Sequence, residues 1–167
     1  YYLDADHNQL HVKEYPVTEV SPGQYIVPDT LREGAWRVGF GIETIDRMDG
    51  VSNRNGVYSL NMSADNKGHF GFHMEEVSFS KSRYLNAHID YAARQLQRKY
   101  FNLCYKQEGN GLTIYDEQNE KGIIKLYAEK PRQIHFEIND AAGNSSTLDL
   151  LVIRDSVMYS KGAATHK

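Results

Sequence analysis

The residues between Asp46 and Asn55 carry the densest group of oxygen-bearing side chains in the chain. Asp46, Asp49, Asn53 and Asn55 place four such side chains within ten residues. Calcium takes six to eight oxygen ligands from carboxylates, amides and backbone carbonyls, so this segment is a candidate calcium site. Its spacing differs from that of an EF-hand loop, and Asp and Asn also cap turns by accepting hydrogen bonds from nearby backbone groups. Turn capping, which needs no ion, is the favoured interpretation, and calcium is the alternative.

The seven histidines invite a search for a second kind of metal site. His69 and His73 are four residues apart, but on a strand this spacing separates them by about 13 Å, which is too far to share one ion. We expect both to be surface or half-buried strand residues. His88 and Asp90 stand two apart at the start of a predicted helix, where such neighbours point in different directions. His135 alternates with apolar residues and is expected to face away from the core.

Residues that could act as nucleophiles or as acid and base are few. No G-x-S-x-G elbow, glycine-rich phosphate loop or HExxH motif occurs. Cys104, the only cysteine, stands in the strand-like setting NLCYK, and we expect a structural thiol. Glu75 and Glu76 are adjacent, so on a strand they would point to opposite faces and not form a glycosidase pair. The sequence therefore predicts that this chain is not itself an enzyme.

Alternating apolar residues predict the strands that must position any site. Residues 35–45 place Trp36, Val38, Phe40 and Ile42 on one predicted buried face. Further strands are expected at 9–20, 24–28, 56–64, 69–79, 101–106, 112–116, 122–128, 132–139 and 146–153. Tight turns are expected at 21–23, 65–68 and 140–144, which are rich in Gly, Asn and Asp.

One segment has helical rather than strand periodicity. Leu85, Ile89, Leu96 and Tyr100 recur at helical spacing, and Ser82 is a candidate N-cap. About nine short strands separated by turns, with this helix among them, predict an immunoglobulin-like antiparallel β-sandwich with one helical insertion at about residues 82–100.

Length and charge limit the classes of function. A chain of 167 residues suits one domain, which we expect to divide into an N-terminal strand arm (1–34), the sandwich (35–155) and a polar tail or linker (156–167). The formal net charge of -3 gives no basic footprint for nucleic acid. No apolar run approaches the roughly 20 residues that a transmembrane helix needs. The chain begins at Tyr1 rather than Met, and we expect a piece of a longer protein.

Several segments, from about residue 35 to residue 153, resemble a known family when they are taken together in order. They are VGFGIETIDRMDGVSNRNGVYS, SRYLNAHIDY, GNGLTIY, GIIKL and INDAAGNSSTLDLLV. They resemble the β-rich region that follows the catalytic domain in lysostaphin-type zinc metallopeptidases of the Bacteroidetes, which are exported and cut peptidoglycan. The zinc-binding H-x-x-x-D and H-x-H motifs of that family do not occur here, so no catalytic residue is carried over.

The resemblance implies a non-catalytic accessory domain, for binding or scaffolding, of an exported peptidoglycan-cleaving zinc metallopeptidase. Its partners would be its own peptidase domain and peptidoglycan or glycan, its location the periplasm or the cell exterior, and zinc would belong only to the upstream catalytic domain. The alternative is a carbohydrate- or cell-wall-binding module that acts without a peptidase. This alternative predicts a line of exposed aromatic side chains across one sheet, whereas aromatics at alternate strand positions are more often core residues.

Overall fold

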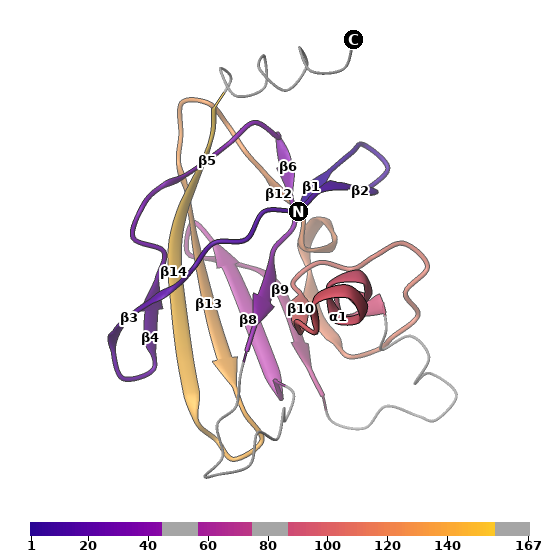
Figure 1. Cartoon of the computed structure of the whole chain (residues 1–167), viewed down its shortest axis with the longest axis vertical. Helices are drawn as coiled ribbons and strands as arrows, with labels where there is room; N and C mark the ends of the chain where they lie inside the picture. Colours follow the sequence, from indigo (N-terminus) through magenta and orange to yellow (C-terminus); the bar gives the residue numbers. More distant parts are fainter. Residues whose placement is uncertain (45–56, 75–86, 156–167) are drawn as a thin grey trace.

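A computed structural model of the protein describes residues 1–44, 57–74 and 87–155, with the backbone alone at positions 117 and 118. These residues form a mostly β structure of several antiparallel sheets with one α-helix, which confirms the fold class that the sequence predicts (Figure 1). In the described ranges, no helix has the length and apolar character needed to cross a membrane.

The largest sheet contains eight strands and forms one layer of the molecule. Across the sheet they are β11 (Tyr115–Gln118), β9 (Lys67–His73), β8 (Ser59–Ala64), β13 (Arg132–Asn139), β14 (Ser145–Arg154), β4 (Gln24–Ile26) and β3 (Thr18–Ser21), with β5 (Leu31–Glu33) also paired to β14. The predicted turn between β8 and β9 is confirmed, because Asp65 and Asn66 have φ values of 51° and 62°. Two successive positive φ angles define the type I′ turn that suits the twist of a hairpin.

Alternate residues give this sheet one apolar face and one polar face. Leu60, Met62, Ile134 and Phe136 are at most 1% exposed and face the core. The opposite face carries polar side chains, including His135, whose Nδ1 lies 2.8 Å from Oδ1 of Asp149 on β14. These alternations match the sequence-based assignment because each strand buries only one side.

The N-terminal arm pairs with the last strand of the large sheet. β3 and β4 form an antiparallel hairpin, and both β4 and β5 run parallel to β14. β14 is ten residues long, so it pairs with β13 on one side and with both short strands on the other.

Smaller sheets form the second layer. One has the order β12 (Ile124–Lys125), β6 (Arg37–Val38), β1 (Tyr2–Leu3) and β2 (Gln9–His11), and the other pairs β7 (Gly41–Glu43) with β10 (Phe101–Leu103). A short turn, η2 (Asn119–Gly122), in which Glu120 and Lys121 have positive φ values of 48° and 55°, leads into β12.

The single strand predicted for residues 35–45 is wrong in two respects. The strand is interrupted at Gly39 and Phe40, between β6 and β7, which belong to different sheets. Trp36 is 47% exposed whereas Val38 is 4% exposed, so they do not share one buried face. Gly39 packs against the ring of Tyr105, and a Cβ there would lie 2.4 Å from a ring carbon.

The helix is shorter than predicted. α1 runs from Tyr91 to Gln97, with Asp90 as N-cap: its carboxylate accepts a hydrogen bond from the backbone N–H of Ala93 at 2.9 Å. Arg98 adopts a left-handed conformation and ends the helix, so the prediction that it continues to residue 100 is wrong. Leu96 is 83% exposed and does not belong to a buried face. Ser82, the predicted N-cap, lies outside the described residues.

Candidate binding groove

A hollow of about 1180 Å³ lies between the inner face of β14 and residues 12–17, which connect β2 to β3; we call it the groove. Its floor includes the apolar residues Leu148, Leu150 and Val152 of β14. Sites for small molecules are typically concave, largely apolar and roughly 300–1,000 Å³ in volume. The groove is therefore large enough for an extended ligand.

Tyrosines and polar side chains complete the lining of the groove. Tyr2, Tyr15 and Tyr25 contribute aromatic rings from three different parts of the N-terminal arm. The turn between β13 and β14 contributes Asp140 and Asn144 at the rim. Asp140 already accepts hydrogen bonds from the backbone and side chain of Asn144, at 2.8 and 2.7 Å, so the turn is held rigidly. The lining thus combines aromatic surface with a few fixed polar groups.

Glu33, at the end of β5, is the most unusual polar group of the groove. Its side chain is 5% exposed, and its carboxylate accepts hydrogen bonds from the hydroxyl groups of Tyr2 and Tyr15 and from Lys13 Nζ, the last at 2.9 Å. Burial alone would raise the pKa of Glu33, but these three donors lower it below its usual value. The same contacts outweigh burial and raise the pKa of Lys13. Glu33 and Lys13 are therefore a charged pair on the wall of the groove.

His88 lies in a second polar cluster, away from the groove. Its side chain is buried, with Nδ1 3.2 Å from the hydroxyl oxygen of Tyr115 and the ring edge-on to Phe72 at 4.3 Å. Asn110 Nδ2 donates to the same hydroxyl at 2.7 Å, which leaves the hydroxyl proton free to be donated to Nδ1. Among the described residues, His88 Nε2 has no hydrogen-bond partner. Burial without a compensating charge lowers the pKa of His88 to about 4.

We expect His88 to make stability depend on pH. Its folded-state pKa of about 4 lies below the ordinary value of 6.5, so between these values the unfolded chain binds a proton that the folded protein does not. This stability is fully present above pH 6.5 and is lost as the pH falls toward 4. The free energy of unfolding should be about 2 kcal/mol lower at pH 5 than at pH 7, as measured by urea denaturation.

The matched controls for that titration are His88→Phe and His135→Gln. His88→Phe should largely remove the difference in the free energy of unfolding between pH 5 and pH 7, because no proton is taken up at this position on unfolding. His135→Gln, on the outer face of β13, should keep it. Equal pH dependence in the wild type and in His88→Phe would show that His88 is not responsible.

His69 and His73, which are four residues apart in the sequence, contact different partners. His69 is buried, contrary to the expectation that it is a surface or half-buried residue, and its Nε2 lies 2.9 Å from the carbonyl oxygen of Ile123. The cause is a β-bulge: Met62 pairs with Phe70 and the next residue of β8 pairs with Gly68, so His69 is an extra residue in the ladder. His73 is half-buried, as expected, and contacts Asp116 at 2.6 Å.

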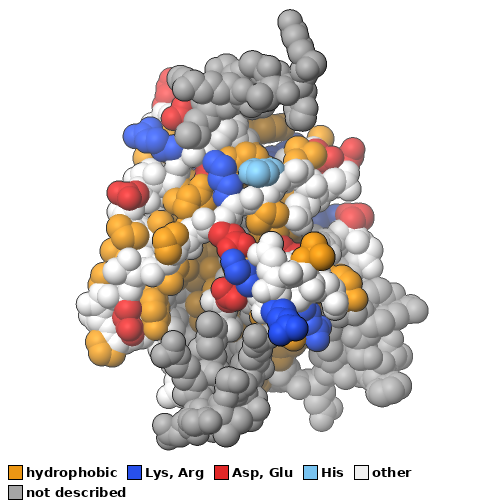
Figure 2. Space-filling model, viewed as in Figure 1, with side chains coloured by type: hydrophobic (Ala, Val, Ile, Leu, Met, Phe, Trp, Pro, Cys, Tyr) orange, Lys and Arg blue, Asp and Glu red, His pale blue; other side chains and the backbone are white. Residues whose placement is uncertain are grey.

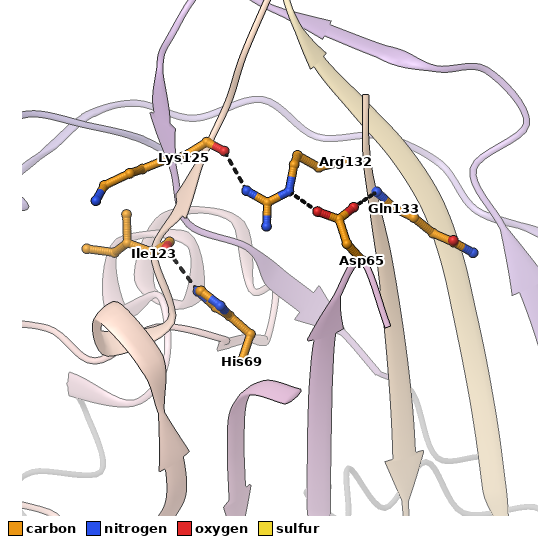
Figure 3. Close-up of polar contacts among 6 residues, drawn as sticks. All are labelled: Asp65, His69, Ile123, Lys125, Arg132 and Gln133. Carbon is orange, nitrogen blue, oxygen red and sulfur yellow. Dashed lines mark hydrogen bonds and ion pairs between the residues drawn. The ribbon is translucent and has the colours of Figure 1, made fainter. Parts of the chain in front are cut away.

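Figure 3 shows how this region joins the two layers of the molecule. Asp65, in the turn after β8, accepts hydrogen bonds from Arg132 Nε and from the backbone N–H of Gln133, the second at 3.0 Å. Arg132 also donates to the carbonyl oxygen of Lys125 on β12 at 3.0 Å. Burial opposes the ionised carboxylate, but these donors lower the pKa of Asp65 below its usual value. The turn, β13 and β12 are thereby held in fixed positions.

The candidate ion site cannot be placed in the same way, since Asp46, Asp49, Asn53 and Asn55 all lie outside the described residues. Glu75 and Glu76 also lie outside them. Within residues 1–44, 57–74 and 87–155, no group of three or more His, Cys, Asp or Glu side chains is arranged to hold a metal ion. Cys104 is fully buried in the core, and burial raises the pKa of its thiol, as suits a structural residue.

Sequence reasoning did not identify the groove, because its walls come from residues that are far apart in the chain. A signal was present in the charged and aromatic residues of the arm, Lys13, Tyr15 and Glu33, but their contact depends on tertiary structure. Comparisons with models of protein families, with curated proteins and with solved structures find no match for this chain.

Proposed function

We propose that this chain is a non-catalytic binding module and that the groove binds a glycan segment of a cell-wall polymer. The observation that carries this proposal is the groove itself, which has a volume of about 1180 Å³. Its lining is mostly apolar, bears tyrosines and has a few fixed polar groups. Sugars present apolar C–H faces that pack on aromatic rings, and hydroxyl groups that donate to carboxylates and amides. The groove offers both kinds of partner.

The outer face of the large sheet is less suited to binding a sugar than the groove is. Its central strands present polar side chains there, such as Asn61, His135 and Glu137. The exposed aromatics of the described residues are not aligned across the large sheet; Tyr91 lies on α1, and Trp36, Tyr58 and Tyr127 lie in segments between strands. The groove therefore brings aromatic rings together, whereas the central strands of the outer face present polar side chains.

The resemblance of residues 35–153 to the region that follows a peptidase domain supports a place beside such an enzyme in the cell envelope. A second contact with the polymer raises the effective concentration of an attached enzyme at its substrate. The alternative is a wall-binding module that works without a peptidase, using the same groove. The residues encoded ahead of Tyr1 distinguish the two: H-x-x-x-D and H-x-H motifs there favour the peptidase-linked module, and a coding sequence without them favours the alternative.

Two valines of the arm provide a matched test of the groove. Val17 lines the groove and is 48% exposed, whereas Val20, on β3, is 56% exposed and does not line it. Val17→Glu places a charge on the apolar rim, which costs about 1 kcal/mol when a ligand covers it, so binding should weaken about fivefold. The measurement is co-sedimentation with purified peptidoglycan over a range of protein concentrations.

Val20→Glu is the control and should bind as the wild type does, because the same change is made on the same arm outside the groove. The proposal fails if the wild-type protein does not sediment with peptidoglycan. It fails equally if the two variants bind with the same affinity, since the groove would then not be the site.

A further inference from the structure

Residues 12–17 cross in front of the large sheet on their way from β2 to β3 (Figure 1), and every one of them lines the groove. We call this segment the strap. Its backbone makes no hydrogen bond to the backbone of the other described residues, because it belongs to no strand of either layer. The strap is therefore held by its side chains, unlike the strands on both sides of it.

Two sets of contacts hold the strap. Lys13 and Tyr15 both donate to the carboxylate of Glu33. Glu14 pairs with Lys99, and these side chains are 41% and 36% exposed. Exposed ion pairs contribute roughly 0–1 kcal/mol, whereas hydrogen bonds to a buried charged group contribute about 1.5–3 kcal/mol. The contacts with Glu33 are therefore the main attachment of the strap.

Glu33 itself does not depend on the strap for its position. It belongs to β5, which pairs with β14, and it also accepts a hydrogen bond from Tyr2 of β1, which is not part of the strap. If the strap moved away, the carboxylate would stay in the groove with one donor instead of three. A buried carboxylate that loses its donors is costly, so the strap is closed in most molecules until a ligand replaces them.

We propose that Glu33 is the residue that anchors a glycan in the groove, and that the strap shields Glu33 from the ligand. In the closed state the Tyr15 hydroxyl and the Lys13 ammonium occupy the positions that hydrogen-bond donors of the ligand take when it binds. This inference rests on the proposed function and adds both the anchoring group and the control of access. A carboxylate prepared for hydroxyl and ammonium donors selects ligands that carry adjacent hydroxyl groups and disfavours anionic ones. Figure 2 shows acidic and basic side chains gathered near the middle of this face, next to hydrophobic side chains on the side of β3 and β4.

Tyr15→Phe tests the strap, because it removes one donor to Glu33 and keeps the ring. Loss of one such hydrogen bond should make strap opening easier, and cleavage within residues 12–17 by a non-specific protease should accelerate about fivefold or more. The apparent affinity for neutral oligosaccharides of N-acetylglucosamine should rise by a similar factor, because less of the protein is in the shielded state. Tyr127→Phe, the same change outside the groove, should alter neither quantity.

Glu33→Gln tests the anchor, because it keeps the size of the side chain and removes its charge. Glycan binding should weaken at least tenfold even though the strap opens more readily, while Glu137→Gln on the outer face of β13 should bind as the wild type does. Circular dichroism shows whether Glu33→Gln remains folded. If it does not, Lys13→Met takes its place: it leaves the carboxylate in position, and faster cleavage of the strap with tighter glycan binding supports the inference.

The outcomes separate this inference from the proposed function. Failure of the wild-type protein to bind any glycan overturns both. Binding that Val17→Glu weakens but that Tyr15→Phe and Glu33→Gln leave unchanged overturns the strap and the anchor alone. Faster cleavage of the strap in Tyr15→Phe without tighter binding also overturns the inference, since opening would then not control access.

Discussion

Replacement of Gly122 by alanine is expected to lower the free energy of unfolding by about 4 kcal/mol, because two independent constraints act on this residue. Its φ of +84° is a conformation that only glycine adopts without strain. A Cβ there would also lie 2.4 Å from the carbonyl oxygen of Cys104 and 2.8 Å from the Cα of Tyr105. Both are backbone atoms of the core, so they cannot move aside as the end of a flexible side chain would.

Gly143 is the control for the conformational part of that effect. Its φ is +90°, but nothing lies within 4 Å of a Cβ built on it. Gly143→Ala should therefore cost only about 1 kcal/mol, the strain of a left-handed alanine. Urea denaturation of the two variants measures the difference. Equal losses would mean that η2 shifts to relieve the contact and that close packing at Gly122 is not what excludes a side chain.

Phe136→Ala is expected to have a comparable effect, about 4 kcal/mol, because it leaves a cavity at the centre of the core. Phe136 is 0% exposed and stands between Met62 of β8 and Leu148 of β14 in the large sheet. Its ring also packs edge-on against Phe40 at a centroid distance of 5.8 Å. Neighbours on both sides and above limit how far the site can collapse.

Glu137→Ala, one residue further along β13, is the control because its side chain lies on the outer face of the sheet. Its expected cost is below about 0.5 kcal/mol. Thermal unfolding followed by circular dichroism compares the two variants. A large loss for Glu137→Ala, or a small one for Phe136→Ala, would show that the assigned faces of β13 are reversed.

The sequence alone predicts the central hairpins of this fold correctly. Two signals agree there: apolar residues alternate along 56–64, 132–139 and 146–153, and the intervening turns contain residues that accept positive φ or cap a turn. Each hairpin buries only one face, so the period-2 pattern has a direct physical meaning. Asp65 and Asn66 adopt the positive φ angles that such a turn requires.

The errors arise where tertiary structure overrides a local pattern. Helical spacing predicts a helix to residue 100, but Arg98 turns left-handed and the chain then enters β10, so the helix ends early. Alternation predicts one strand over residues 35–45, but Gly39 must approach Tyr105, and the chain changes sheets there. The burial of His69 depends on a bulge, which no periodicity reveals. Long-range packing decides each of these cases.

The groove is the part of the molecule that the sequence could not predict. Glu33 receives donors from positions 2, 13 and 15, and nothing in their spacing indicates that they converge on one carboxylate. Parallel pairing of β4 and β5 with β14 brings them together, and this pairing joins segments more than 100 residues apart. Local sequence patterns predict a separate N-terminal arm, whereas in the structure this arm forms one wall of the groove.

The same parallel pairing has a consequence for how the protein is made. The partner strand of β4 and β5 ends at Arg154, so these two early segments can join the sheet only after nearly all the described residues have left the ribosome. Until then Tyr25, Ile26 and Leu31 lack the neighbours that cover them in the finished molecule. Such late, distant pairing is slow, and it leaves a nascent chain exposed to aggregation during translation.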